Sequence, residues 1–366
     1  MNILFLTNHL NVGGISSYLF TLAGGLKQNG HNVYVASGGG ELVEKFTAAG
    51  IGHIAVPLRT KKEISPKIIF SFFRLRKEIK RLKIDLLHSN SRTTQVLGNL
   101  LSRYSGKPHI FTCHGFFKPK LSRRLFPCWG DCLVAISREV KEHLIVDFKL
   151  DAGKISVINN GIDLQGFGDF SARKKSRETL GIGEAPLIGI VARLSDVKGH
   201  TYLFKAMRSV VKSFPSARLL VVGEGKMKEA LVKEADDLAI KDSIIFLPQV
   251  GGTENVLAAM DVFVMPSLQE GLGLALMEAM AQGLAVVGSA VGGIKTLIKD
   301  GANGLLVEPA DQAALALAIM RLLNDERLRN SLGANARKFI MENFSKENMV
   351  KETEGAYRRA SSVKRS

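Results

Sequence analysis

The sequence contains few cysteines and no long apolar run. Three of its 366 residues are cysteine, and an odd, sparse number of this kind does not make a disulfide framework. No apolar stretch approaches the roughly 20 residues that a membrane-spanning helix needs. The first apolar segment, 2–7, is too short for a signal-peptide core and has no basic flank before it. We therefore expect a cytoplasmic protein; peripheral attachment to the inner face of the cytoplasmic membrane stays open.

Several ligand-binding motifs are also missing. A dinucleotide-dependent oxidoreductase would need a G-x-G-x-x-G turn and a ribose-binding acid about 20 residues later, and neither occurs, nor does a P-loop. Cys128 and Cys132 have metal-like spacing but no convincing further ligands, which disfavours zinc. No DNA- or RNA-binding motif accompanies the basic residues, so we expect no nucleic-acid partner.

Acidic residues are the minority charge. The chain has 50 lysines and arginines against 34 aspartates and glutamates, a formal charge of +16, and the excess is largest before residue 170. Two segments there, Arg59–Lys83 and Phe116–Phe126, mix cations with aromatic residues. One interpretation is docking on an anionic membrane, with apolar side chains in the interface and cations on the headgroups. The other is a helix whose phenylalanines face its own core while its lysines are solvated.

Short apolar runs alternate with helical stretches along the whole chain, a pattern that favours parallel sheets flanked by helices. The strands expected in the first half are 3–7, 32–36, 53–56, 85–89, 109–113, 132–136 and 155–158, with helices such as 16–29, 66–82 and 92–104. The second half repeats the alternation, with strands at 187–192, 218–222, 244–247, 262–265 and 285–288.

The expected fold class is therefore α/β, with two Rossmann-like domains that face each other across a cleft. Residues 1–168 would form the first domain, 169–184 a polar linker rather than core, and 185–345 the second domain. Residues 346–366 would form a helix that packs back on the first domain and ends in a basic tail. Ligands of such sheets bind beyond the carboxyl ends of the strands.

Two loops that follow first strands have candidate anion-binding residues. Gly13 and Gly14 precede a helix, where the backbone can approach a ligand and the helix N-terminus favours an anion. A tight strand-to-helix turn is the plainer interpretation. Arg193 and Lys198 follow the strand that opens the second half, and a forked donor with a point charge suits a diphosphate. Solvated loop cations are the alternative.

A third loop is more informative. Glu270 follows a strand, Gly271 and Gly273 keep the backbone open, and Glu278 falls in the apolar helix that begins there. A surface glutamate is usually a solvated charge, but Glu278 has apolar neighbours on both sides. Carboxylates accept hydrogen bonds from paired hydroxyls, so both glutamates suit sugar or ribose rings.

The segment Glu270-Gly-Leu-Gly-Leu-Ala-Leu-Met-Glu278 resembles the E-x7-E signature of glycosyltransferase family 4, whose members are retaining and have the GT-B fold. Further segments resemble the family in order along almost the entire chain: Gly13-Gly14, 112–115, 159–163, Arg193 with 198–199, 222–225 and 300–307. This ordered set is far more specific than any single motif. It implies a retaining hexosyltransferase with a nucleotide-diphosphate-sugar donor, UDP-linked more than GDP-linked.

The resemblance also implies roles for individual residues. Arg193 and Lys198 would hold the donor diphosphate with the backbone of Gly273 and Leu274, and Gly271 and Leu272 would also bind the donor. Glu278 would bind the ribose, Glu270 the transferred sugar, and the backbone near Val250 would flank the base. Gly13 and Gly14 would approach the diphosphate from the first, acceptor-binding domain, and His114 would lie near the sugar. Taken alone, a histidine after a strand is more often structural.

The implied mechanism is a front-face exchange in which the departing phosphate takes the acceptor's proton. No essential metal or other cofactor is expected, since no Asp-x-Asp motif is present. The acceptor would be a lipid-linked or envelope glycan. Lys295 and Thr296 stand where many members carry proline and glutamate, which puts polar contacts near the donor in doubt. The alternative function is a catalytically idle GT-B protein that binds nucleotide or glycan.

Overall fold

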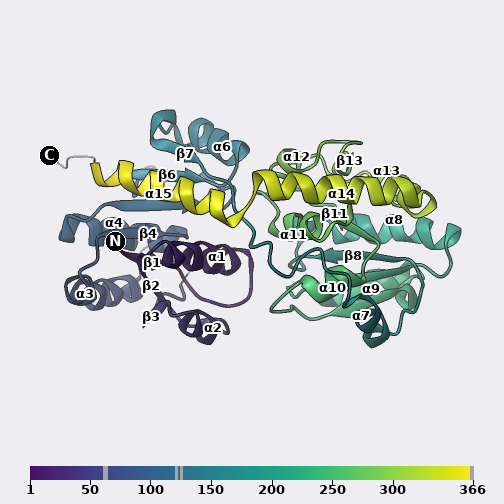
Figure 1. The fold of residues 1–366 in the computed structure, drawn as a ribbon, viewed down its shortest axis with the longest axis horizontal. Helices are drawn as coiled ribbons and strands as arrows, with labels where there is room; N and C mark the ends of the chain where they lie inside the picture. The colour runs from purple at the N-terminus through teal and green to yellow at the C-terminus, as the bar shows by residue number, and fades with distance from the viewer. Residues whose placement is uncertain (61–64, 120–122, 124–126, 363–366) are drawn as a thin grey trace. The chain divides into compact units, whose positions relative to one another are not determined.

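The computed structural model describes residues 1–60, 65–119, 123 and 127–362 (Figure 1). The chain forms two compact units. Unit 1 comprises Met1–Asp163 and Lys346–Ser366, and unit 2 comprises Leu164–Ser345.

Unit 1 contains a parallel sheet of seven strands in the order β3-β2-β1-β4-β5-β6-β7. Its strands are β1 (Asn2–Leu6), β2 (Asn32–Ser37), β3 (Gly52–Ala55), β4 (Leu86–Ser89), β5 (His109–Cys113), β6 (Cys132–Ala135) and β7 (Ile155–Val157). Its helices are α1 (Gly14–Gln28), α2 (Val43–Ala48), α3 (Pro66–Arg81), α4 (Arg92–Ser105), α6 (Arg138–Phe148) and α15 (Lys346–Ser362). The β4–β5 register pairs His88 with Ile110.

The last helix belongs to the first unit. In Figure 1, α15 is the yellow helix near the C-terminus; it packs on α1 and on the sheet. Its buried side chains Met349, Val350 and Tyr357 join the core formed by β1, β2 and α1. Burial of this apolar surface, at roughly 25 cal/mol per Å², holds the end of the chain in place.

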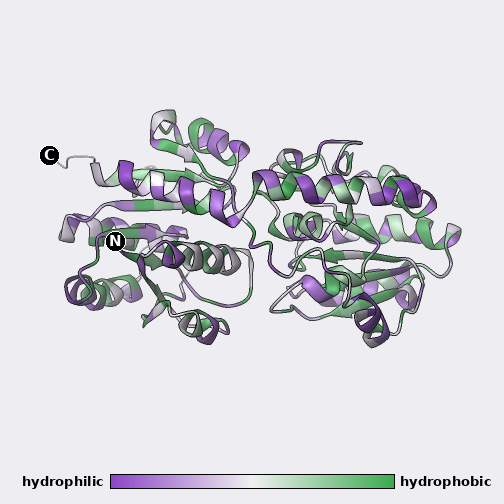
Figure 2. Cartoon of the chain, in the orientation of Figure 1, coloured by the Kyte–Doolittle hydropathy of each residue, from purple (hydrophilic) through white to green (hydrophobic). Residues whose placement is uncertain are grey.

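Unit 2 contains a parallel sheet of six strands in the order β10-β9-β8-β11-β12-β13. Its strands are β8 (Leu187–Val191), β9 (Arg218–Val222), β10 (Ile244–Leu247), β11 (Val262–Met265), β12 (Ala285–Ser289) and β13 (Leu305–Val307). Its helices are α7 (Arg173–Leu180), α8 (His200–Ser213), α9 (Lys228–Asp237), α10 (Glu254–Ala259), α11 (Leu274–Gln282), α12 (Ile294–Leu297), α13 (Gln312–Asn324) and α14 (Glu326–Asn343). Figure 2 shows the strands as predominantly hydrophobic and the helices as mixed, as expected for sheets buried on both faces.

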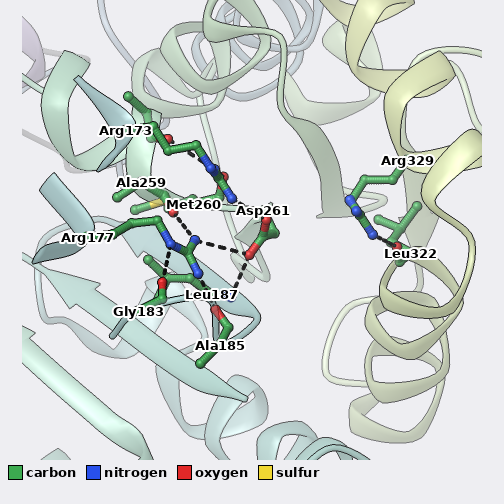
Figure 3. Close-up of polar contacts among 11 residues, drawn as sticks. Arg173, Arg177, Gly183, Ala185, Leu187, Ala259, Met260, Asp261, Leu322 and Arg329 are labelled. Atoms are coloured by element: carbon green, nitrogen blue, oxygen red, sulfur yellow. Dashed lines mark hydrogen bonds and ion pairs between the residues drawn. The ribbon is translucent and has the colours of Figure 1, made fainter. Parts of the chain in front are cut away.

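The expected strands agree with the observed ones to within one residue at each end, but β13 was not predicted. The expectation that 169–184 is a polar linker rather than core is wrong for Arg177, which is buried on the helix α7 that begins at Arg173. The Arg177 guanidinium donates to the carbonyls of Gly183, Ala185 and Ala259, and it pairs with Asp261 (Figure 3). Arg173 binds the other carboxylate oxygen of Asp261, at 2.6 Å. A buried charge requires such partners.

Candidate functional site

The candidate donor residues of unit 2 follow strands β8, β10 and β11 at their carboxyl ends. Lys198 ends a short 3₁₀ turn after β8, and Glu270 follows β11. The Lys198 ammonium and the Glu270 carboxylate form an ion pair, although 72 residues separate them. Their side chains are only 20% and 13% exposed, so the pair is largely withdrawn from solvent. The structure therefore brings together one of the two expected diphosphate ligands and the expected sugar ligand.

The backbone around Glu270 is held from two directions. Its carboxylate accepts a hydrogen bond from the Gly271 N–H at 3.2 Å, and its carbonyl accepts one from the Gly293 N–H at 3.1 Å. Gly292 has a φ of 42°, and a side chain there would place Cβ 2.1 Å from the Glu270 carbonyl oxygen. Only glycine fits this approach. The loop after β12 thus supports the sugar-binding candidate, a role that the sequence analysis did not assign to Gly292 or Gly293.

Helix α11 begins beside Glu270. Gly273 precedes the helix with a φ of 95°, and Leu274 is its first residue. Gly271, Leu272 and Gly273 are buried. Among the described residues no side chain caps this N-terminus, and free N–H groups at the start of a helix suit an anion.

Glu278 lies one turn into α11, and its carboxylate accepts a hydrogen bond from the Thr253 hydroxyl at 2.9 Å. Burial raises the pKa of Glu278 to about 7; the Thr253 bond opposes this rise and the nearby Glu254 adds to it. Thr253 was not among the predicted site residues. It lies three positions after Val250 in the β10–α10 loop, and that shared loop was the available signal.

The remaining candidates of unit 2 are more exposed than Glu270 and Glu278 or only half-buried. Arg193 is exposed and forms no ion pair within the described part of the chain. Val250 is half-buried in the β10–α10 loop. Lys295, which departs from the family pattern, is exposed on α12, whereas Thr296 is half-buried.

The candidates of unit 1 lie at the carboxyl ends of its strands, after β1 and β5. Gly13 has a φ of 153° and precedes α1, and a Cβ at Gly13 or Gly14 would meet no atom within 4 Å. His114 directly follows β5. Tyr18, from the second turn of α1, places its ring edge-on to the His114 imidazole, with centroids 4.7 Å apart. Tyr18 therefore links α1, the helix that follows Gly13, to His114.

His114 is held by a polar neighbour rather than by a charge. Its Nε2 lies 3.1 Å from Asn90 Oδ1, at the end of β4. Burial lowers the pKa of His114 to about 3, so the imidazole is neutral at physiological pH. A neutral imidazole acts through hydrogen bonds and does not neutralise a phosphate.

The first basic segment forms an amphipathic helix with an exposed apolar face. Helix α3 starts with Pro66 after the N-cap Ser65, and its Ile68, Leu75 and Ile79 are buried. Ile69, Phe70 and Phe73 point outward and are 57%, 61% and 49% exposed. The interpretation in which the phenylalanines face the core is therefore wrong for Phe70 and Phe73.

The second basic segment is only partly described, since residues 120–122 and 124–126 lie outside the described residues. Phe116 and Phe117 are half-buried. Phe116 packs edge-on against His143, and the Phe117 N–H donates to the same imidazole at 2.8 Å. The Phe117 ring stacks on that of Phe111, so both phenylalanine rings have partners within unit 1.

Within residues 1–60, 65–119, 123 and 127–362, no group of three or more histidine, cysteine, aspartate or glutamate side chains is placed to hold a metal ion. No described helix is both long and apolar enough to cross a bilayer.

Comparison with known proteins covers nearly the whole chain. The family model "Glycosyltransferase Family 4" matches residues 12–165 and "Glycosyl transferases group 1" matches residues 172–339. The chain is 31% identical to a UDP-Gal:α-D-GlcNAc-diphosphoundecaprenol α-1,3-galactosyltransferase of Escherichia coli, over 78% of this chain and 77% of that protein. It is 28% identical to an uncharacterised glycosyltransferase of Methanocaldococcus jannaschii, over 95% and 94%. Anabaena HepE in complex with UDP and glucose has a TM-score of 0.86 at 21% identity, over 99% of both chains. The expected fold of two Rossmann-like sheets is confirmed.

Proposed function

The chain belongs to glycosyltransferase family 4 and is a retaining glycosyltransferase with a nucleotide-diphosphate-sugar donor, and from this premise we propose that the donor is a UDP-sugar and the acceptor a lipid-linked glycan. The E. coli relative is named for UDP-galactose and for a diphosphoundecaprenol acceptor, and the Anabaena neighbour holds UDP. Both names support UDP. The structural observation behind a diphosphate-sugar donor is the Lys198–Glu270 pair beside the uncapped start of α11, whereas the choice of UDP and of the acceptor rests on the names of these relatives.

Each unit 2 residue has one task in this proposal. Arg193, Lys198 and the N–H groups at Gly273 and Leu274 bind the diphosphate. Glu270 binds hydroxyls of the transferred sugar, aided by the backbone of Gly271 and Leu272. Glu278 binds the ribose and the backbone near Val250 flanks the base.

Three residues of unit 1 are also assigned to the donor in this proposal. Gly13 and Gly14 admit the diphosphate close to the backbone. His114 contacts the transferred sugar. We assign acceptor binding to this unit as a whole.

The chemistry follows from where charge develops. Breaking the bond between sugar and diphosphate leaves positive charge on the ring and adds negative charge to the leaving oxygen. Two cations and a helix N-terminus placed at that oxygen stabilise the transition state more than the ground state. The acceptor oxygen then bonds to the anomeric carbon on the face that the diphosphate leaves, and its proton goes to the departing phosphate, so the anomeric configuration is retained. In this scheme the two glutamates position the donor and the cations promote its cleavage.

The test is release of nucleoside diphosphate from a panel of UDP- and GDP-sugars. We expect slow hydrolysis of one UDP-sugar without acceptor, a decrease of about 100-fold in Lys198→Met, and loss in Glu270→Ala. Glu229→Ala, an exposed glutamate on α9 of the same unit, is the matched control. Binding of UDP without release from any donor would instead support the catalytically idle alternative.

We further propose that helix α3 docks on an anionic membrane, where lipid-linked acceptors reside. Its exposed residues Ile69, Phe70 and Phe73 suit the interface, and basic side chains border them. The Arg76 guanidinium lies 4.8 Å from the centre of the Phe73 ring and 5.9 Å from that of Tyr104, a half-exposed neighbour on α4. Each cation near such a surface adds about 1 kcal/mol.

Sedimentation with liposomes tests this surface. Wild type should bind vesicles of anionic lipid at low salt and leave them at high salt, because salt screens the attraction. The double variant Phe70→Ser/Phe73→Ser should lose most of the binding. Leu317→Ser removes a side chain that is 65% exposed in unit 2 and should leave vesicle binding unchanged. Equal binding of both variants would count against α3 as the docking element.

A further inference from the structure

Two polar side-chain contacts join the end of β4 to the end of β5. His88 and Asn90 alternate along β4 and its end, and Thr112 and His114 do the same on β5, so all four side chains share one face of the sheet. His88 Nε2 lies 2.7 Å from the Thr112 hydroxyl, and His114 Nε2 lies 3.1 Å from Asn90 Oδ1. His88, Asn90 and Thr112 are each no more than 1% exposed.

Two helices from opposite ends of the chain cover this face. Tyr357 of α15 places its hydroxyl 2.8 Å from His88 Nδ1, so both nitrogens of that imidazole have partners. Tyr18 of α1 places its hydroxyl 3.4 Å from that of Thr112 and its ring against His114. The two tyrosine hydroxyls thereby hold the strand ends from this one face.

The Asn90 amide has a defined orientation. Its Nδ2 donates to the His88 carbonyl at 3.5 Å, which turns Oδ1 toward His114. A carbonyl oxygen can only accept, so the facing Nε2 of His114 must carry the proton. Because burial keeps the imidazole neutral, Nδ1 then has a lone pair and no proton. Within the described part of the chain, Nδ1 has no hydrogen-bonding partner.

We propose that Asn90 is a positioning residue that holds His114 in the Nε2–H tautomer, so that Nδ1 accepts a hydrogen bond from a hydroxyl of the donor sugar. The His88–Thr112 contact supports this arrangement by fixing the two strand ends. The inference rests on the proposed function, in which His114 contacts the sugar. It adds which nitrogen makes the contact, what kind of group it receives, and which residue sets that choice.

The tautomer is measured directly by NMR on the full chain labelled with ¹⁵N-histidine. The chain has eight histidines, and the His114 signals are assigned from their loss in His114→Gln. In wild type we expect a proton on Nε2 and an unprotonated Nδ1. Asn90→Ala should give a mixture of tautomers, and Asn90→Asp, which keeps an acceptor, should restore the proton on Nε2. A proton on Nδ1 in wild type, or an unchanged His114 signal in Asn90→Ala, would overturn the proposal.

A matched variant separates positioning from general damage. Asn159 also follows a strand of unit 1 and donates its amide to a carbonyl, that of Ile136, at 2.8 Å. Asn159→Ala should therefore lower the melting temperature as Asn90→Ala does, yet leave the His114 tautomer unchanged.

Kinetics supply the second readout. Asn90→Ala should lower kcat for donor hydrolysis by up to about 100-fold, the effect of misplacing a contact group. In the His114→Gln background the same change should have no further effect, whereas additive losses would contradict the coupling. The NMR measurement uses no substrate, so it tests Asn90 even if no donor is turned over. Conversely, a donor panel without any turnover would refute the proposed function and leave the tautomer result standing.

Discussion

Donor binding should release a proton from Glu278, and affinity should therefore increase with pH. The pKa of this carboxyl group in the free protein is about 7, because burial disfavours the charged form. In the proposed function both ribose hydroxyls donate to Glu278, which requires the carboxylate. Arg193 and Lys198 offset the charge of the diphosphate, so the hydroxyl bonds decide the pKa in the complex. Binding then selects the ionised fraction.

The magnitude follows from that pKa. About 9% of Glu278 is ionised at pH 6 and about 91% at pH 8, so the apparent affinity should increase about tenfold between them. About 0.9 proton should be released per donor bound at pH 6, and about 0.1 at pH 8. The ligand must be an intact UDP-sugar, because a terminal phosphate ionises near pH 6 and would obscure the effect.

Isothermal titration calorimetry in two buffers of different ionisation enthalpy gives both quantities. Glu278→Gln is the control: it should bind more weakly and with no proton release attributable to this site. The variant also tests how the pKa of Glu278 affects the stability of the free protein. A raised carboxyl pKa means that the folded chain holds this proton more tightly than the unfolded chain, so the group's contribution to stability decreases as pH increases from about 4.5 to 7. Donor affinity that is constant or lower at pH 8, with no proton release at pH 6, would refute this reasoning.

Two further predictions concern residues that hold the site's framework. Arg177→Met should destabilise the protein by about 3–5 kcal/mol in urea unfolding, because it leaves Asp261 with one partner fewer and three carbonyls without donors. Lys175→Met, an exposed cation on the same helix, should change stability by less than about 0.5 kcal/mol; comparable losses would show that the Arg177 contacts contribute little. Gly292→Ala should raise the KM for donor, since its Cβ would displace the Glu270 carbonyl, whereas Gly301→Ala, also at positive φ but with open space, should cost only backbone strain of about 1 kcal/mol. Equal donor KM in both glycine variants would contradict the support of Glu270 by Gly292.

The sequence was sufficient for elements whose local pattern is strong. Buried strands such as Val262–Met265 are continuous apolar runs between turn residues, and their ends could be placed closely. Strand β13 has three residues and was missed, although β7, which is equally short, was predicted. Helix α7 is strongly polar, and nothing local indicates that Arg177 is buried. Its burial depends on Asp261, which lies 84 residues away and becomes a neighbour only when the sheet forms.

The site shows the same division. The chemistry of Lys198 and Glu270 was predicted from residue type and family pattern, but their pairing was not, because it depends on the adjacency of β8 and β11. This pairing has a consequence for donor binding. Two glutamates beside a diphosphate would repel it if both were charged and unpaired. In the free protein Glu270 is neutralised by Lys198, and Glu278 is about half protonated near neutral pH. In the free protein the two carboxylates therefore repel an incoming diphosphate less than two unpaired charges would. On the proposed function, the Lys198 ammonium moves from Glu270 to the diphosphate, and the sugar hydroxyls take its place on Glu270. The contact that stabilises the diphosphate charge thus leaves Glu270 free to position the sugar.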